Sequence, residues 1–466
     1  MDIDWLENEI KELFEKNRVT VLRDGKRVSY HAPYLRPQIE YPLWTSGQLN
    51  RLWRIWYRVM QPFRVNYPHQ WFWDSCAHAI ALSHLNPELA KCEIESLLSA
   101  QQEDGSIPHM IWNCNSMHWL DRIFHYLYPQ GPGSPYIQPP ILAEAVEAVY
   151  QKTGDKAFLG TVLPALYRYY SYLATVRTRG DDGLAEIIIS YESKDRGREY
   201  DVIYGESNAK HVLLGPMTRL MIRHHFMGWD KDKIFASNLF RVKDLLFNCV
   251  YAENLLSLNG LYGVLGAQEE QRLFGEMAKK VETSILTKMY DEEMGLFYSL
   301  DARYGQDKQI KMNTISSLMP VILSGIDEFR VQRLVRDYLH NPAEFWLAYP
   351  VPVDPLSSGL VAVKQDVIWR GMQTWILPNW YIVRGLRKQA NRFPRSYHEY
   401  NKIADELTLK TYEMVRREGF REFYDSQTGE GRRARDFGMS TLVLDMIAPM
   451  ESGQGQPSPA QGDIDP

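Results

Sequence analysis

Two tryptophans and an aspartate lie close together in the segment 69–78, which reads His-Gln-Trp-Phe-Trp-Asp-Ser-Cys-Ala-His. Trp71 and Trp73 can each offer a flat apolar face, and the carboxylate of Asp74 can accept two hydrogen bonds. A sugar ring has apolar C–H faces and a rim of hydroxyl groups, so an aromatic face beside a carboxylate suits it. The alternative is that these aromatic side chains fill the core, and the segment taken alone does not separate the two interpretations.

Carboxylates recur in two later segments. Segment 192–201 reads Glu-Ser-Lys-Asp-Arg-Gly-Arg-Glu-Tyr-Asp, and a buried acid there could have a raised pKa and donate a proton to a leaving oxygen. Carboxylates among basic residues are otherwise usually part of a solvated loop. Glu422 is followed by Phe-Tyr-Asp and could take a proton from a water molecule, whereas the ordinary alternative is an exposed surface glutamate.

A third aromatic segment, 366–380, contains Trp369, Arg370, Trp375 and Trp380. The planar guanidinium of Arg370 could hold a hydroxyl or a carboxylate by two parallel hydrogen bonds. Trp375 could stack on a sugar ring. The alternative is an ordinary helix start with a structural arginine.

The rest of the chain reads as a series of helices that must position these segments. Asn86 before Pro87 is a helix start, and Gly154 followed by Asp155 ends one helix and begins the next. Helices of ten to twenty residues with unequal loops indicate helix hairpins packed side by side, and a closed ring of hairpins needs no sheet. We therefore expect an all-α fold, with residues 1–450 as one domain with loop insertions and residues 451–466 as a disordered tail.

The composition and charge of the chain limit the classes of molecule that it is expected to bind. The 466 residues carry 45% hydrophobic content and a net charge of -5, which allows a large core and shows no basic stripe for nucleic acid. The four cysteines form no CxxC pair and have no metal-ligand spacing. Neither a signal peptide nor an apolar run of ~18 residues is apparent. We expect a cytoplasmic protein without a metal that acts on a small soluble molecule and does not bind a membrane; a homo-oligomer is compatible with the sequence.

The order of these segments is characteristic. Along the chain come Trp-Phe-Trp-Asp-Ser, Gln138-Pro-Pro, Glu-Ser-x-Asp, Trp-Arg-Gly, and Glu-Phe-Tyr-Asp with Thr-Gly-Glu-Gly. In this order, from about Tyr67 to Ile447, the chain resembles glycoside hydrolase family 63, and in particular its compact bacterial members that act on mannosylglycerate or glucosylglycerate. Two of the motifs, Trp-Phe-Trp-Asp and Trp-Arg-Gly, are shared with related (α/α)6 clans. The resemblance implies an (α/α)6 barrel that hydrolyses an α-glycosidic bond with inversion and needs no cofactor.

The same resemblance implies roles for individual residues. It makes Asp195 the general acid and Glu422 the general base. An inverting site needs these carboxyl groups roughly 6.5–9.5 Å apart, which leaves room for the attacking water. The sugar contacts that the resemblance implies are Tyr67, Trp71, Trp73, Asp74, Gln138, Trp369, Arg370, Trp375 and Trp380.

The segment around Asp195 departs from the family's usual Glu-Ser-Gly-x-Asp-Asn-Ser-Pro. Lys194 replaces the glycine, one residue is missing, and Arg-Gly-Arg replaces Asn-Ser-Pro. The acid could therefore be Glu192 or Asp201, and activity could also be lost. The extra cations of the segment would suit an anionic aglycone such as glycerate; they are Lys194, Arg196 and Arg198. A second departure is Phe-Gly-Met-Ser at 437–440, where an aromatic residue often follows the glycine.

Other functions remain compatible with the same residues. A trehalase-like hydrolase or a sugar epimerase could use an (α/α)6 fold, and an epimerase would need histidine bases, for which His69, His109 and His118 are candidates. Outside enzymes, the altered segment near Asp195 favours a sugar-binding pseudoenzyme. Release of glucose or mannose from α-glycosides would separate these functions.

Overall fold

The computed structural model describes most of the chain. The described residues are 1–23, 25–35, 67–112, 128, 131–193, 216–303, 305–359 and 369–451. Asp195 and Asp201 lie outside them, as does the tail predicted at 451–466, except for Glu451 at the end of a helix.

Helices dominate the described residues, as the sequence predicts. The α-helices are α1 (Ile3–Asn17), α3 (Phe72–Leu85), α4 (Pro87–Leu98), α6 (Leu142–Thr153), α7 (Lys156–Tyr172), α9 (Pro216–Phe226), α10 (Lys231–Ala236), α11 (Leu245–Leu265), α12 (Gln268–Ser284), α13 (Glu328–Arg333), α14 (Ile376–Arg392), α15 (Tyr397–Glu418) and α16 (Val443–Glu451). Two 3₁₀ helices, η7 (Ile315–Ile322) and η11 (Gly438–Leu442), complete the framework. Within the described part of the chain, no helix has both the length and the apolar character that crossing a membrane requires.

The helix ends follow local sequence signals. The side chain of Asn86 accepts a hydrogen bond from the backbone N of Leu89 at the start of α4. Gly154, with φ 64°, ends α6 in the left-handed conformation that glycine adopts without strain. Asp155 then accepts from the backbone N of Phe158 at 3.0 Å and begins α7. The predicted helix boundaries at these positions are confirmed.

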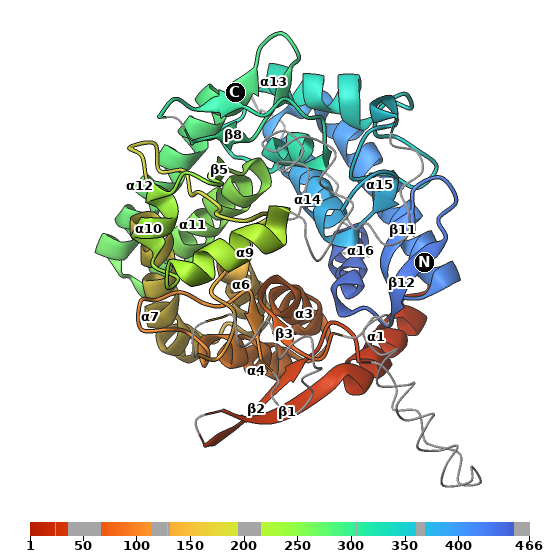
Figure 1. Cartoon of the computed structure of the whole chain (residues 1–466). Helices are drawn as coiled ribbons and strands as arrows, with labels where there is room; N and C mark the ends of the chain where they lie inside the picture. Colours follow the sequence, from red (N-terminus) through yellow and green to blue (C-terminus); the bar gives the residue numbers. More distant parts are fainter. Residues whose placement is uncertain are drawn as a thin grey trace, which may run out of the picture.

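The helices form a closed circuit of contacts. Helix α3 packs on α6, α6 on α11, α11 on η7, η7 on α14, α14 on η11, and η11 returns to α3. Each of four members also packs on the α-helix that follows it in the chain, namely α4, α7, α12 and α15. Figure 1 shows α3, α6 and α14 nearer the middle of the molecule and α4, α7 and α12 nearer its edge.

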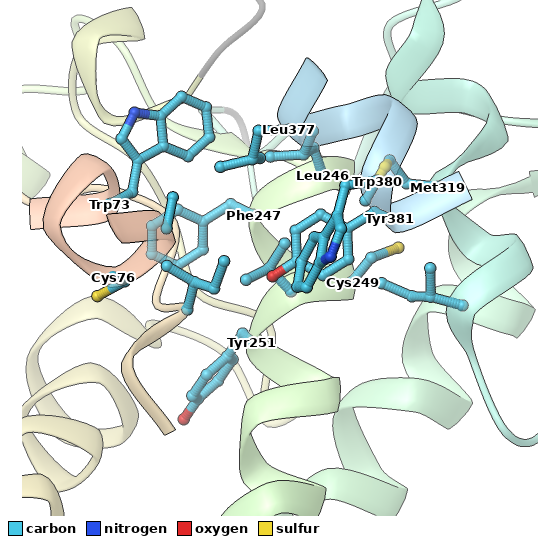
Figure 2. Close-up of a cluster of buried hydrophobic side chains, with 14 of the residues drawn as sticks. Trp73, Cys76, Leu246, Phe247, Cys249, Tyr251, Met319, Leu377, Trp380 and Tyr381 are labelled. Atoms are coloured by element: carbon cyan, nitrogen blue, oxygen red, sulfur yellow. The ribbon is translucent and has the colours of Figure 1, made fainter. Parts of the chain in front are cut away.

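The hydrophobic core lies where the members of this circuit face each other. Figure 2 shows Trp73 and Cys76 of α3 beside Phe247 of α11, with Met319 of η7 and Tyr381 of α14 in the same cluster. All five side chains are buried. Because the core is continuous from α3 to α14, the start of α3 is held against its neighbours and can present side chains in a fixed geometry.

The strands are short and join the ends of helices. The described strands are β1 (Arg18–Arg23), β2 (Lys26–His31), β3 (Gln70–Trp71), β4 (Met110–Ile111), β5 (Val242–Lys243), β6 (Tyr290–Asp291), β7 (Leu296–Phe297), β8 (Leu300–Asp301), β9 (Lys308–Gln309), β10 (Gln373–Thr374), β11 (Arg421–Asp425) and β12 (Gly431–Arg435). All pairs are antiparallel. Two pairings matter for the site: β3 pairs with β4, and β11 lies between β10 and β12.

Candidate active site

A pocket of about 120 Å3 opens among the starts of α3 and α14 and the hairpin β11–β12. The side chains that line it come from segments far apart in the sequence. They are Pro33, Tyr67, Trp71, Trp73, Asp74, Gln138, Tyr191, Ser193, Trp369, Trp375, Glu422, Phe437 and Met439. Eight of the residues singled out in the sequence are therefore in one place.

Two similar strand-to-helix junctions build the walls. Trp71 ends β3 and directly precedes α3, with φ -107° and ψ 136°. Trp375 directly precedes α14 after β10, with φ -106° and ψ 134°. Neither residue caps its helix with its own side chain. The Oε1 atom of Gln138 instead accepts from the backbone N of Trp73 at 3.1 Å, so a distant glutamine satisfies one of the unpaired N–H groups in the first turn of α3.

Asp74 is a buried carboxyl group that faces the pocket from the first turn of α3. It is 4% exposed, and its Oδ1 atom has no hydrogen-bond partner among the described residues. Burial raises the pKa of Asp74 well above its ordinary value, and the charge of Glu422 raises it further. A carboxyl group in this state can donate as well as accept a hydrogen bond, which suits a sugar hydroxyl.

Glu422 is the second carboxyl group of the pocket, and it lies on β11. The hydroxyl of Tyr67 donates to its Oε1 atom at 3.0 Å. Its Oε2 atom accepts from the backbone N of Ala434 at 3.4 Å and lies 3.4 Å from the Nε atom of Arg433. Two hydrogen bonds and one ion pair therefore hold a side chain that is 3% exposed, and contacts of this kind favour the ionised form of a carboxyl group. An ionised, fixed carboxylate is what a general base requires.

Three of the four tryptophans that line the pocket pack against one another, and two of them are stacked. Trp369 lies over Trp375, with ring centroids 3.6 Å apart and planes 14° from parallel. Trp73 packs against Trp369 at 5.8 Å. The Oε1 atom of Gln373 joins the pair, because it accepts from the backbone N of Trp369 at 2.9 Å and from the indole N–H of Trp375 at 3.3 Å. Phe423 also stacks on Trp375, with ring centroids 5.2 Å apart, so two aromatic rings already pack on Trp375 and the expected stacking of a sugar on it stays a prediction.

Comparison with known proteins identifies the family of the chain. Residues 67–440 match the mannosylglycerate hydrolase MGH1-like glycoside hydrolase domain. The chain belongs to this family. It is thus a glycoside hydrolase, and the resemblance to glycoside hydrolase family 63 seen in the sequence is confirmed.

Relatives of the same family match nearly the whole described fold. Mannosylglycerate hydrolase MGH2 of Selaginella moellendorffii is 25% identical over 404 residues, which cover 79% of this chain and 78% of that protein. A mannosylglycerate hydrolase of Thermus thermophilus is 26% identical over 410 residues, 81% of this chain and 93% of the relative. The crystal structure of a GH63 mannosylglycerate hydrolase from another strain of Thermus thermophilus, in complex with Tris, superposes with a TM-score of 0.74 at 21% identity, over 95% of this chain and 100% of that one. The last likeness establishes a shared fold.

Glu192, the first alternative for the acid, is held in the core of this glycoside hydrolase by an ion pair and by hydrogen bonds from the backbone. It is completely buried and pairs with the guanidinium of Arg177. It also accepts from the backbone N of Ile188 at 2.9 Å and of Ile137 at 3.2 Å. These partners tie the loop before Gln138 to the segment at 188, and the described pocket lining does not include Glu192. Asp195 and Asp201 lie outside the described residues, so the separation expected between the acid and Glu422 stays a prediction.

Trp380 is not part of the pocket lining. It lies on α14, five residues after Trp375. Its indole N–H donates to the Oδ2 atom of Asp445 at 2.6 Å, and the guanidinium of Arg384 lies 4.4 Å from its ring centroid. It lines a separate cavity of about 780 Å3. The described pocket therefore does not include Trp380, and its sugar contact stays a prediction.

Arg370 and the candidate histidines also lie off the described pocket surface. Arg370 follows Trp369 in the chain but is not among the described residues that line the pocket. His109 packs edge-on against Trp71 at 5.3 Å, and His69 packs edge-on against Trp112 at 5.2 Å. Both histidines are buried. His118 lies outside the described residues.

Several residues of the pocket were not expected from the sequence. Tyr191 and Ser193 are the neighbours of Glu192 in the chain, and Phe437 and Met439 belong to the segment noted only as a departure from the family. Gln373 lies within the Trp-Arg-Gly segment but its role as a shared acceptor depends on the stack of two tryptophans. The sequence feature that could have indicated these residues is their position next to a motif.

Proposed function

We propose that this glycoside hydrolase hydrolyses, with inversion, an α-mannoside or α-glucoside whose aglycone is glycerate. The observation that carries the proposal is Glu422, a buried carboxylate held by two hydrogen bonds and one ion pair in an aromatic pocket that also contains Asp74. The names of the related mannosylglycerate hydrolases support glycerate as the aglycone. We also propose that residues 1–450 form one domain and that the circuit of helices is an (α/α)6 barrel.

The proposed roles follow from the chemistry of an inverting site. Glu422 takes a proton from the water that attacks the anomeric carbon, and Asp195 gives a proton to the glycosidic oxygen on the opposite side. Asp74, Trp73 and Trp71 hold the sugar by hydrogen bonds and apolar contact. Gln138 uses its carbonyl oxygen on α3, so its amide N–H groups are the part that can reach a hydroxyl.

A panel of glycosides tests the proposal. The purified chain is incubated with α-mannosylglycerate, α-glucosylglycerate, trehalose and the methyl α-glycosides of mannose and glucose, and products are followed by NMR. We expect hydrolysis of a glycerate glycoside, with the β-anomer of the free sugar appearing first. Glu422→Gln should lower kcat by roughly 10²- to 10⁴-fold, as expected for the loss of a general base.

The matched control is Glu430→Gln on the same hairpin, because the side chain of Glu430 is 55% exposed and pairs with Arg432. This control should retain the activity of the wild type. Sugar binding without turnover in the wild type would support the pseudoenzyme instead. Preferred hydrolysis of trehalose would support a trehalase-like enzyme, and an activity that survives Glu422→Gln would exclude Glu422 as the base.

A further inference from the structure

The hairpin that carries Glu422 contains an irregularity directly opposite this residue. Arg421 pairs with Arg435, and Phe423 pairs with Arg432. One residue, Glu422, therefore faces two residues of β12, Arg433 and Ala434, which is the pattern of a β-bulge. Bulges redirect side chains and occur often beside active sites.

The backbone of Arg433 adopts a conformation that its side chain disfavours. Its φ is 57°, in the left-handed region that glycine enters freely and that a residue with a Cβ atom rarely adopts. The surrounding hairpin must therefore impose this conformation, and such outliers gather at functional sites. An arginine in this conformation costs stability relative to glycine.

The guanidinium group is directed at the Glu422 carboxylate. The Nε atom of Arg433 and the backbone N of Ala434 both reach Oε2, each at 3.4 Å, while the hydroxyl of Tyr67 occupies Oε1. The two residues of the bulge thus hold one carboxylate oxygen from the same side. The side chain of Arg433 is 23% exposed and that of Glu422 is 2% exposed. The ion pair between them is therefore largely shielded from solvent.

We propose that Arg433 is a positioning residue that keeps the Glu422 carboxylate ionised and aimed at the attacking water. The inference rests on the proposed function, in which Glu422 is the base. Arg433 does not recognise the glycerate, because in an inverting site the base and the leaving group lie on opposite faces of the sugar. The effect of Arg433 is therefore on the chemical step and not on the choice of aglycone.

Other groups also face Glu422 in the described part of the structure. Tyr67 donates to it, and the nearby carboxyl group of Asp74 is electrostatically coupled to it. Arg433 is the cation that the described structure places within 4 Å of the Glu422 carboxylate. A cation at this distance stabilises the ionised form of a carboxyl group.

Arg433→Gly tests the inference, because glycine keeps the left-handed backbone while the guanidinium group is lost. We expect an unchanged or higher midpoint of thermal unfolding and a kcat lowered about tenfold, with KM changed little. The acid limb of the kcat/KM profile should move to higher pH by roughly one unit, because a carboxylate beside an arginine has its pKa lowered by about 1–3 units. Arg433→Lys keeps the positive charge, so its kcat and the acid limb of its kcat/KM profile should lie between those of the wild type and of Arg433→Gly.

The matched control is Arg432→Ala on the same strand, because Arg432 pairs with Asp425 and Glu430 and not with Glu422. It should keep the kcat and the pH profile of the wild type. A wild-type kcat and pH profile in Arg433→Gly, or the same change in Arg432→Ala, would overturn the inference. Glu422→Gln in the same assay separates the two proposals: if it remains active, the base assignment has failed, whereas if it is inactive and Arg433→Gly is normal, only the role of Arg433 has failed.

Discussion

Glu93 is a completely buried carboxylate on α4 that holds the start of α3, and its replacement would show how firmly the site is anchored. Its Oε2 atom accepts from the backbone N of His31 at 2.9 Å and lies 2.8 Å from the Nδ1 atom of His31. Its Oε1 atom accepts from the hydroxyl of Ser75, the residue after Asp74. Burial by itself would raise the pKa of Glu93, but the interactions with His31 and His78 outweigh burial and lower the pKa to about 2.

The lowered pKa of Glu93 determines how much this residue contributes to the free energy of unfolding and over which pH range. A carboxyl group whose pKa is 4.5 in the unfolded chain and about 2 in the fold contributes about 3 kcal/mol to the free energy of unfolding. The contribution is present above pH 4.5 and is lost as the pH falls towards 2, because the unfolded chain takes up the proton first. About 2 kcal/mol of it is lost between pH 5 and pH 3.

Glu93→Gln removes this titration. We expect the difference in free energy of unfolding between the wild type and Glu93→Gln to shrink by about 2 kcal/mol when the pH is lowered from 5 to 3. Urea denaturation followed by tryptophan fluorescence at a series of pH values measures it. The control is Glu95→Gln, at an exposed position on the same helix. Its free energy of unfolding should change with pH in the same way as that of the wild type. If Glu93→Gln also ran parallel to the wild type, the buried network would not be coupled to folding as described.

Three further substitutions probe the site and its support. Asp74→Asn should lower kcat/KM by roughly 10- to 100-fold. It should also raise the free energy of unfolding at pH 7, because the pKa of Asp74 is raised in the fold. The carboxyl group of Asp74 therefore favours the fold below pH 3.8, and this contribution is lost as the pH rises through the folded pKa. Gly438→Ala should lower the stability by about 1–3 kcal/mol, because a Cβ atom there would lie 2.2 Å from Nε2 of the buried His78. Glu192→Gln should lower the stability by about 3–5 kcal/mol by leaving Arg177 buried without its partner.

Controls accompany these substitutions. Gly160→Ala lies in the exposed middle of α7 with open space around it, and it should raise the stability by roughly 0.5–1 kcal/mol in the same thermal unfolding assay that tests Gly438→Ala. An equal loss in both alanine variants would contradict the packing argument. For Glu192→Gln, loss of activity with unchanged unfolding would instead make Glu192 the acid. For Asp74→Asn, an unfolding free energy below that of the wild type at pH 7 would contradict the cost assigned to its burial.

Local chemistry made part of the fold predictable. The caps at Asn86 and Asp155 depend on side chains three residues from the backbone groups they satisfy, so the sequence carries them directly. The convergence of segments around Trp73, Trp375 and Glu422 was predicted through the order of motifs along the chain. Their grouping in one pocket agrees with that order.

The remaining features depend on contacts that no local pattern records. Trp380 and Trp375 share one aromatic segment, yet they line different cavities. Glu192 was an alternative acid because the segment around Asp195 departs from the family pattern, and its partner Arg177 lies on a different element and has no motif that would reveal the pairing. The left-handed Arg433 is the clearest case, because the usual sequence signal for that backbone is glycine, and only the register of the hairpin reveals it.

The contact between η11 and α3 brings the two ends of the helical circuit together. The elements involved begin at Phe72 and Gly438, so the circuit closes only when almost the entire described chain has left the ribosome. Until then α3 and α14 lack a common neighbour, and their apolar surfaces are open to association with other chains. Synthesis of this enzyme should accordingly be more sensitive to chaperone supply than that of a repeat protein of equal length, whose units are stabilised by their immediate neighbours.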